Sequence, residues 1–422
     1  MADHKEIDQN ITTSAYFAGR DFHTDFEVLR KEDPVHWTEG NYGRPFWSIT
    51  RHADVIQVLH DVDTFSSRLG GHLPPDPEEV FKVDQYEAGY NSLPTYTDAP
   101  RHMQYRRPFN RHFTTPVVAK LTTGVRELCR EIIDEVAPRG KCDLVEDVSA
   151  ELPSRFVCDL MGVPPEDMGR MRRYTSVFLG SQDPDHRMKG MTASESRLLA
   201  QKEMFDYLLD LAIQRRTDPK DDLTTLIANM ATDGTPWDDR DVGWWCWSMV
   251  AAGLDTTRNG FSLTMQALLE NREQFEMLRA DRSLLDKAVE EGLRYGCPAK
   301  HRFRVVAKDI EFGGKLLKEG DWVVAWLVSA NRDESVFENP QSFDIKRNPN
   351  PHLTFGTSQG DHFCLGRNLA RLEMKLLLDE VLTRLPDIDL DGPGSWLGST
   401  NGSGLKYMPV KFTPQANDTQ VQ

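Results

Sequence analysis

The sequence predicts a mainly α-helical protein with a small β region. From residue 101 to about residue 270, apolar residues recur at steps of three and four, the period of amphipathic helices. From 303 to 328 the pattern changes to short alternating runs separated by Gly-Gly and Glu-Gly turns, which is typical of strands. No internal repeat or low-complexity linker divides the 422 residues, so we expect a single domain over 1–422.

In chain order, the polar first 20 residues are expected to be flexible. Residues 21–61 predict a helix at DFEVLRKED, strands at VHWT and PFWSI, and a helix at RHADVIQVLHD. The Gly-, Pro- and Asp-rich stretch 62–100 predicts a long loop, and such loops are usually functional. The segment DRDVGWWCWSMVAAGLDTTRNGFSLTMQALLEN predicts a helix long enough to cross the core. A helix is expected again after Cys364, and GLKYMPVKF predicts a final strand.

Composition excludes several classes of protein. The net charge of −16 argues against nucleic-acid binding, which needs a basic surface. The six cysteines show no CxxC and no zinc-ligand spacing, so we expect reduced thiols and a cytoplasmic protein. The N-terminus lacks the apolar core of a signal peptide, and no apolar run approaches the length of a membrane span.

The stretch TFGTSQGDHFCLGRNLARLE places a single thiol, Cys364, among glycines at the start of a helix. Gly356, Gly360 and Gly366 permit tight turns and close approach of another group to the backbone. A helix N-terminus lowers a thiol pKa and favours the thiolate. Three interpretations remain open at this point: a buried structural thiol, a nucleophile with His362 as its base, or a ligand of haem iron.

The long predicted helix contains the sequence AAGLDTT at residues 251–257. Gly253 lies within the helix, where it costs roughly 1 kcal/mol relative to alanine. Asp255 and Thr256 follow it and compete for backbone hydrogen bonds. The segment is therefore either a kinked core helix or a distorted turn that leaves room for a small ligand, where an acid and a hydroxyl could deliver protons.

Two further motifs are weak when taken alone. Glu291 and Arg294 in EGLR stand one helical turn apart, a spacing that usually makes a surface ion pair. The stretch RHMQYRRPFNRH is the densest basic segment of the chain, and His102 and Arg106 lie four residues apart on one helix face. It is either a solvated face or a set of groups that holds carboxylates.

The ordered set HxxxR, AGxDTT, ExxR and HxCxG resembles the cytochromes P-450, the haem-thiolate monooxygenases. The resemblance includes ANRDESVFENPQSFDIKR at 330–347 and extends from about residue 30 to the end. It implies the cytochrome P-450 fold, with haem b between the long central helix and the cysteine loop. It also implies that O2 is activated at the haem iron to hydroxylate or epoxidise a hydrophobic small molecule. The electrons would come from NAD(P)H through a separate ferredoxin and ferredoxin reductase.

The same resemblance implies roles for individual residues. Cys364 is expected to bind the iron, with Gly360, His362 and Gly366 forming the loop around it. Asp255 and Thr256 are expected to deliver protons to dioxygen beside Gly253. Two further sets of residues have expected roles. A structural cluster is expected to consist of Glu291, Arg294 and Arg347. The haem propionates are expected to be held by His102, Arg106, Arg304 and His362.

One departure from the family pattern concerns the loop before the cysteine. Two extra residues separate Phe355 from Cys364, so Phe355 and Gly356 are expected to be displaced from the thiol. His352 is expected to compete with His362 for a propionate.

By the same resemblance, the substrate pocket draws on residues 70–96, 176–184, Met249 and Ala299. The small Ala299 leaves room above the haem, which favours a bulky lipid, terpenoid, steroid or polycyclic substrate. Lys300, His301 and Arg302 are interpreted as solvent-facing charges, with contact to a substrate carboxylate as the alternative. The arginines on the ferredoxin side would be Arg107, Arg111, Arg367 and Arg371, unless they are ordinary surface or structural residues.

Rival functions remain open. A haem-thiolate peroxygenase or isomerase would need no external electrons, although the Asp255–Thr256 pair favours dioxygen activation. A haem-based carrier or sensor would bind ligands without turnover. A helical scaffold without cofactor would be colourless when purified.

Overall fold

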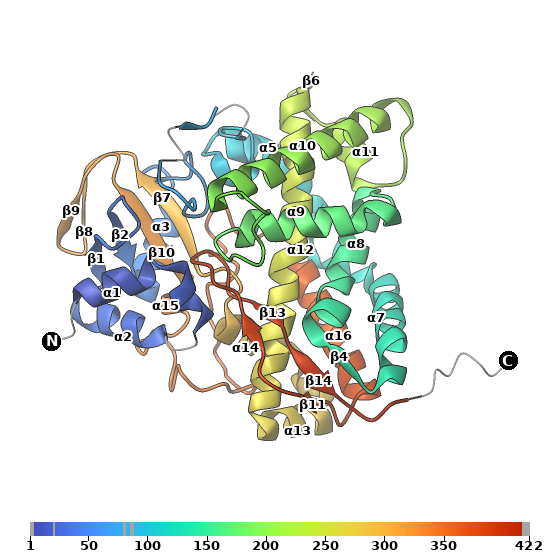
Figure 1. Ribbon diagram of the computed structural model, residues 1–422. Helices are drawn as coiled ribbons and strands as arrows, with labels where there is room; N and C mark the ends of the chain where they lie inside the picture. Colours follow the sequence, from blue (N-terminus) through green and yellow to red (C-terminus); the bar gives the residue numbers. More distant parts are fainter. Residues whose placement is uncertain (1–3, 20–21, 79–81, 85–87, 416–422) are drawn as a thin grey trace.

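The computed structural model describes residues 4–19, 22–78, 82–84 and 88–415. A helical part surrounds the long helix α12 (Asp239–Glu270), and a sheet part lies beside it, on the left in Figure 1. Each part has its own cluster of buried apolar side chains. The two parts are connected by β7 (His301–Val306), where the chain passes from the helical part into the sheet.

The helical part is built around α12, which is buried along most of its length. The helix begins after Asp238, whose side chain accepts a hydrogen bond from the Asp241 backbone N–H at 2.7 Å, as an N-cap does. The other helices of this part are α5 (Arg101–Asn110), α6 (Thr115–Ala119), α7 (Thr122–Val136), α8 (Glu151–Met161), α9 (Met168–Gly180), α10 (Ala193–Thr217), α11 (Leu223–Ala228), α13 (Arg272–Ala280), α14 (Leu285–Gly296) and α16 (Arg367–Arg384).

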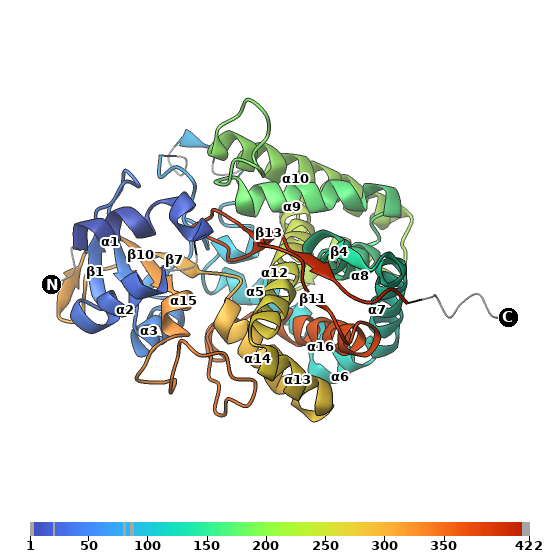
Figure 2. The ribbon, with the colours of Figure 1, turned by 60° about the horizontal axis from the view of Figure 1, so that its bottom comes forward.

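The sheet part contains a five-stranded sheet in the order β1-β2-β10-β7-β3. Its strands are β1 (Val35–Thr38), β2 (Phe46–Ile49), β3 (Phe65–Ser66), β7 and β10 (Trp322–Trp326). β10 is buried along its whole length, and it pairs in parallel with β2 and antiparallel with β7. The helices α1 (His4–Ile11), α2 (His23–Glu32), α3 (His52–His60) and α15 (Leu327–Ala330) lie around this sheet, as Figure 2 shows from a second direction.

The remaining strands form small sheets. β14 (Pro409–Lys411) lies between β4 (Lys141–Asp143) and β11 (Asp389–Leu390). The two-stranded pairs are β5 (Ala231–Thr232) with β6 (Thr235–Pro236), β8 (Ile310–Phe312) with β9 (Lys315–Leu317), and β12 (Ser395–Trp396) with β13 (Leu405–Tyr407).

These elements confirm the predicted helices and strands of residues 21–61 and the strands of 303–328. The expected final strand is two short strands, β13 and β14. The prediction of a flexible N-terminal segment is wrong for residues 4–18, because α1 and the 3-10 helix Ser14–Ala18 are ordered there. The physical reason is that Ile7, Ile11 and Phe17 are buried in the core of the sheet part.

Within the described residues, no helix combines the length and the apolar character that crossing a membrane requires.

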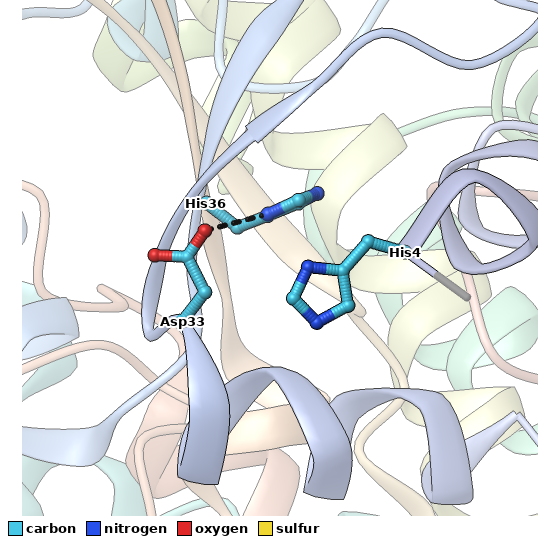
Figure 3. Close-up of side chains that lie close together, drawn as sticks. All are labelled: His4, Asp33 and His36. Carbon is cyan, nitrogen blue, oxygen red and sulfur yellow. Dashed lines mark hydrogen bonds and ion pairs between the residues drawn. The ribbon is translucent and has the colours of Figure 1, made fainter. Parts of the chain in front are cut away.

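An ion-pair cluster joins α1 to the start of the sheet. His4, Asp33 and His36 lie close enough to hold a metal ion in principle (Figure 3). Both ring nitrogens of His36 are already engaged, however: Nδ1 lies 2.9 Å from Asp33 Oδ2, and Nε2 lies 2.7 Å from Asp8 Oδ1. Burial lowers the pKa of His36, but the hydrogen bonds to Asp8 and Asp33 outweigh it, and the net pKa is raised. The cluster therefore serves as a charged clamp on α1.

This clamp makes a pH-dependent contribution to stability. Because folded His36 binds its proton more tightly than the unfolded chain, the contribution is complete below the ordinary pKa of about 6.5 and disappears as the pH rises past the raised value. Replacing His36 by Gln should lower the free energy of unfolding by about 1–3 kcal/mol at acidic pH and by less at alkaline pH. Urea unfolding of both proteins measures this difference. His60→Gln, at a histidine outside the cluster, is the control, and an equal cost of His36→Gln at both pH values would contradict the clamp.

Candidate active site

A large internal cavity lies between α12 and the loop that carries Cys364. Its walls come from α5, α8, α9, α12, β7, α16 and the long loop before α5. The regions predicted to form the substrate pocket contribute several of the lining residues: Gly71, Leu93, Tyr96, Phe178, Leu179, Met249 and Ala299. Its walls are thus mainly apolar, with a few polar groups at defined places, as in most small-molecule sites.

The loop before α16 brings Cys364 into the cavity. The Cys364 backbone N–H donates to Phe355 O at 2.9 Å, and both residues line the cavity. Two turns take up the extra residues: Gly360 N–H donates to Thr357 O, and Phe363 N–H donates to Gly360 O, each at 3.0 Å. The backbone of Phe355 is therefore held beside that of Cys364, because the longer loop folds back on itself between the two residues.

The electrostatics of Cys364 favour a metal ligand over a free nucleophile. Burial raises the pKa of the thiol, although the Gly366 backbone N–H and the nearby guanidinium groups of Arg302, Arg106 and Arg367 act in the opposite direction. Burial outweighs the lowering that the helix N-terminus predicted. A bound metal ion reverses this balance, because a coordinating thiol loses its proton outright.

Four cationic or potentially cationic side chains meet beside the thiol. The rings of His102 and His362 pack with centroids 4.0 Å apart. Arg106 donates from Nη2 to Phe363 O, and Arg304 donates from Nη1 to Phe303 O at 2.7 Å. Within the described residues, Arg304 Nε is buried without a hydrogen-bond partner, and these two arginines form no ion pair with a carboxylate. Burial lowers the pKa of Arg304 to about 10.

α12 presents small residues to the cavity. The helix is unbroken through 251–257, so the predicted distorted turn is not present. Gly253 lines the cavity where α12 meets α8, and a Cβ there would lie 2.8 Å from Val157 Cγ2. Thr256 also lines the cavity, and its hydroxyl donates to Ala252 O at 2.8 Å.

Asp255, in contrast, is not among the residues that line the cavity. Its carboxylate pairs with Arg258 at 2.6 Å and accepts a hydrogen bond from Asn259 Nδ2 at 2.9 Å. The sequence therefore identified two adjacent polar residues that the structure assigns to different faces of α12. The partner Arg258 lies three residues beyond Asp255, and sequence reasoning missed it.

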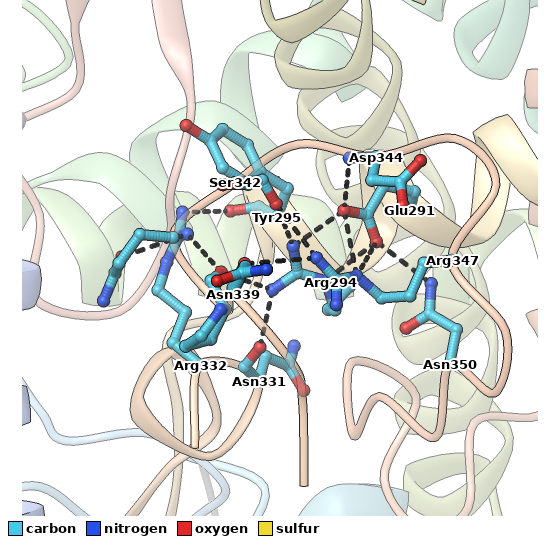
Figure 4. A network of polar contacts seen from close by, with 12 residues as sticks. Glu291, Arg294, Tyr295, Asn331, Arg332, Asn339, Ser342, Asp344, Arg347 and Asn350 are labelled. Carbon is cyan, nitrogen blue, oxygen red and sulfur yellow. Dashed lines mark hydrogen bonds and ion pairs between the residues drawn. The ribbon is translucent and has the colours of Figure 1, made fainter. Parts of the chain in front are cut away.

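A buried ionic network holds α14 to the chain that follows the sheet (Figure 4). Arg294 donates from Nε and Nη2 to the two Glu291 oxygens at 2.8 and 2.7 Å, and both side chains are fully buried. Arg347 adds a bond to Glu291 at 3.1 Å, and Asp344 N–H donates to the same carboxylate at 2.9 Å. The spacing in EGLR thus makes an internal ion pair rather than a surface one.

The same helix also fixes the cysteine loop and α16. Glu290 pairs with Arg371 at 2.5 Å and with His352 at 3.0 Å. Burial raises the pKa of Glu290, but the hydrogen bonds from these two partners outweigh it and lower the pKa to about 2. His352 lies at Glu290 rather than in the cavity, so its expected competition with His362 is wrong.

The interpretation of Lys300 and His301 as solvent-facing is wrong. Lys300 is buried, its Nζ donates to Ser399 O at 2.9 Å and to Gly402 O, and it lies over the rings of Phe17 and Phe22. His301 is fully buried, with Nδ1 3.2 Å from Thr400 O. Burial lowers the pKa of Lys300 to about 7 and that of His301 to about 3.

Among the polar residues of the cavity that sequence reasoning did not name individually are Glu373 and His72, the latter within the predicted range 70–96. Burial raises the pKa of Glu373 to about 8, and its Oε2 has no hydrogen-bond partner in the described part of the chain. An acid on the apolar face of the helix after Cys364 was the signal that could have identified it. His72 gave no such signal, because its loop has no periodicity.

A half-buried thiol that faces a long helix across an apolar cavity, with arginine and histidine side chains at its edge, is the arrangement expected of the haem-thiolate class of protein. Comparison with known families agrees: the profile of the family Cytochrome P450 matches residues 14–386. The chain belongs to the cytochrome P450 family and is a monooxygenase, a haem-iron oxidoreductase.

Relatives and solved structures share this assignment. "Steroid C26-monooxygenase" of Mycolicibacterium smegmatis is 32% identical over 393 residues, which is 91% of this chain and 89% of the relative. "Methyl-branched lipid omega-hydroxylase" of Mycobacterium bovis is 33% identical over 398 residues, 92% of this chain and 90% of the relative. The crystal structure of CYP108D1 from Novosphingobium aromaticivorans matches with a TM-score of 0.86 at 31% identity, covering 97% of this chain and 98% of that chain.

Family membership implies a haem-thiolate centre that uses O2. The residues present fit that group, because the cavity combines a single thiol with arginines that have no carboxylate partner among the described residues. Haem supplies two propionate carboxylates, which are the partners these guanidinium groups lack.

The buried network should dominate the stability of the helical part. Glu291→Gln leaves Arg294 buried without its counter-charge, so the free energy of unfolding should fall by about 3–5 kcal/mol. Urea unfolding and the haem content of the purified protein measure the effect. The control is Glu276→Gln, which removes only the half-exposed pairs with Arg272 and Arg279 and should cost at most about 1 kcal/mol. Equal costs of the two substitutions would show that the network is not the anchor.

Proposed function

We propose that this cytochrome P450 hydroxylates or epoxidises a hydrophobic small molecule with electrons delivered by a separate ferredoxin and its reductase. The observation that carries the proposal is the cavity itself, in which Cys364 and Thr256 line the same largely apolar space. A cytoplasmic setting accords with six free cysteines.

In this proposal Cys364 binds the haem iron, and His102, Arg106, Arg304 and His362 hold the propionates. The bound haem supplies the activation of dioxygen and the transfer of one oxygen atom. The protein fixes the orientation of the cofactor, because paired donors on α5 and β7 bind carboxylates in defined directions. Gly360 and Gly366 shape the loop that carries the thiol, and Gly253 keeps the opposite wall free of a side chain.

Thr256 and Asp255 have different tasks in proton delivery. Thr256 Oγ1 lies in the cavity and can pass a proton directly to a group beside α12. Asp255 is held by Arg258, so it can exchange protons with the cavity only after that pair opens. In this proposal Asp255 transfers protons between Thr256 and the region outside the cavity.

The apolar walls favour a bulky hydrophobic substrate. Ala299 and Met249 line the cavity, together with Phe178 and Leu179. The relatives above are named for action on a steroid and on a methyl-branched lipid, and those names support the lipid and steroid classes among our expectations.

Two of the four arginines predicted to contact the ferredoxin remain available for that role. Arg371 is committed to Glu290, and Arg367 donates to Cys364 O at 2.9 Å and stacks on Phe363. Arg107 and Arg111 are exposed near Arg106 and therefore remain available to an acidic partner.

Two variants test the chemistry. Cys364→Ser should abolish the red-shifted Soret band that the reduced, CO-bound protein gives with a thiolate ligand. Thr256→Ala should keep that band but lower the product formed per NAD(P)H oxidised by about tenfold or more, because the cavity loses its hydroxyl. Thr264→Ala is the control, since Thr264 makes the same bond within α12 (2.7 Å to Gly260 O) away from the cavity. Full turnover with peroxide alone would instead favour the peroxygenase, and ligand binding without product would favour the carrier.

A charge reversal tests the electron donor. Arg107→Glu combined with Arg111→Glu should raise the KM for a [2Fe–2S] ferredoxin about tenfold at low salt, and the difference should shrink as salt screens the charges. The rate at which ferredoxin reduces the haem, followed by stopped flow, measures this difference. The control is Lys308→Glu, on the exposed end of the sheet part. A rate independent of salt in the unchanged protein would contradict this docking surface.

A further inference from the structure

Arg302 is a cation inside the active-site cavity that lacks an anionic partner. It lines the cavity, and its one hydrogen bond among the described residues runs from Nη1 to His301 O at 2.9 Å. None of the ion pairs of the described residues includes it. Burial lowers the pKa of Arg302, yet a guanidinium stays charged in proteins. Arg302 is half-buried in the cavity wall, and a guanidinium that faces a cavity without a counter-charge gains when an anion binds.

The position of Arg302 is fixed by the sheet. Arg302 is the second residue of β7 and pairs with Ala325 of the buried strand β10. Because side chains alternate along a strand, Arg302 and Arg304 point to one side, while Phe303 points to the other and is fully buried. The guanidinium is therefore presented to the cavity by a rigid element rather than by a loop.

His72 is placed beside Arg302 by bonds on either side of it. Phe303 N–H donates to Gly71 O at 3.1 Å, and Leu73 N–H donates to His301 Nε2 at 3.1 Å. His72 lines the cavity, and no hydrogen bond of its ring is formed within the described residues. Burial first, and then the charge of Arg302, lower the pKa of His72 well below its ordinary value. The neutral ring can thus donate one hydrogen bond next to the guanidinium.

The other basic groups of this strand region are already engaged. Lys300 and His301 bind backbone carbonyls, and Arg304 lies with His102, Arg106 and His362 at the edge assigned to the propionates; the charge of Arg302 also acts on His362. Two propionates have four candidate partners there, which leaves Arg302 for another anion.

We propose that Arg302, with His72 beside it, binds the carboxylate of the substrate, which is therefore an amphipathic acid with an apolar body of the lipid or steroid class. This inference rests on the proposed function and names its substrate class. Bidentate binding to the guanidinium would fix one end of the molecule at β7, and the apolar walls would direct the rest along α12 past Thr256.

The test compares acids with their neutral esters. The spin-state shift of the Soret band is titrated with palmitic acid and its methyl ester, and with a steroid carboxylic acid and its methyl ester. In the unchanged protein we expect one of the acids to bind about 10–100-fold more tightly than its ester. Arg302→Gln should remove this preference and leave the affinity for the ester within about threefold. Arg302→Lys should retain part of it, because it keeps the charge without the bidentate geometry.

Haem content and the CO difference spectrum separate the alternatives. Both should be unchanged in Arg302→Gln, and Lys308→Gln, which removes an exposed charge just beyond β7, should behave like the unchanged protein. Equal binding of acid and ester, no binding of either acid, or a preference that survives in Arg302→Gln would overturn the proposal. Haem loss in Arg302→Gln would also overturn it, by assigning Arg302 to a propionate. A missing thiolate spectrum in the unchanged protein would contradict the proposed function instead.

Discussion

The buried ion pair between Glu291 and Arg294 is the interaction on which the active site depends. Arg294 also donates from Nη1 to Asn331 O and Pro340 O and from Nη2 to Ser342 O, each at 2.9 Å, so one guanidinium fixes a long irregular segment to α14. From the same helix, Glu290 holds Arg371 of α16. The loop carrying Cys364 lies between these two anchors in the chain, so α14 holds the segments on both sides of it. Such a charge pair stabilises the fold only while every partner is present. The side of the cavity that carries Cys364 is therefore rigid but intolerant of substitution.

Charges in this protein are treated differently inside and outside the cavity. On the α14 side, each buried arginine meets carboxylate or carbonyl oxygens, as Figure 4 shows for Arg294, Arg332 and Arg347. Around the cavity, Arg302 and Arg304 have only backbone carbonyls among the described residues. Arg332, however, also meets only carbonyl oxygens, so buried arginines outside the cavity can lack a carboxylate partner as well. What distinguishes Arg302 and Arg304 is that they line the cavity, where the carboxylate of a ligand can reach them.

The sequence predicted what depends on spacing and failed where tertiary burial decides. Glu291 and Arg294 could be paired from their helical spacing, and the family resemblance added Arg347, but nothing local in the sequence indicates that the pair is fully buried. Lys300 and His301 looked solvated because charge usually implies exposure, whereas the carbonyls of Ser399, Thr400 and Gly402, about a hundred residues away, satisfy them. The position of Phe355 depended on turns within the extra residues, and their geometry cannot be read from a residue count.

The adjacent residues Asp255 and Thr256 of α12 lie in two different environments, outside and inside the cavity. Ala252, Gly253 and Thr256 face the cavity with little bulk, whereas Asp255 turns to Arg258 and Asn259. The Asp255 carboxylate is engaged by Arg258 at 2.6 Å and does not line the cavity, so it does not reach a group in the cavity while that pair is closed. Proton transfer through Asp255 therefore requires a local opening of the pair, while Thr256 needs only a rotation of its hydroxyl away from Ala252 O. Because the burial of Arg258 opposes that opening, Thr256 rather than Asp255 is the polar group that this arrangement presents to the cavity without a prior rearrangement.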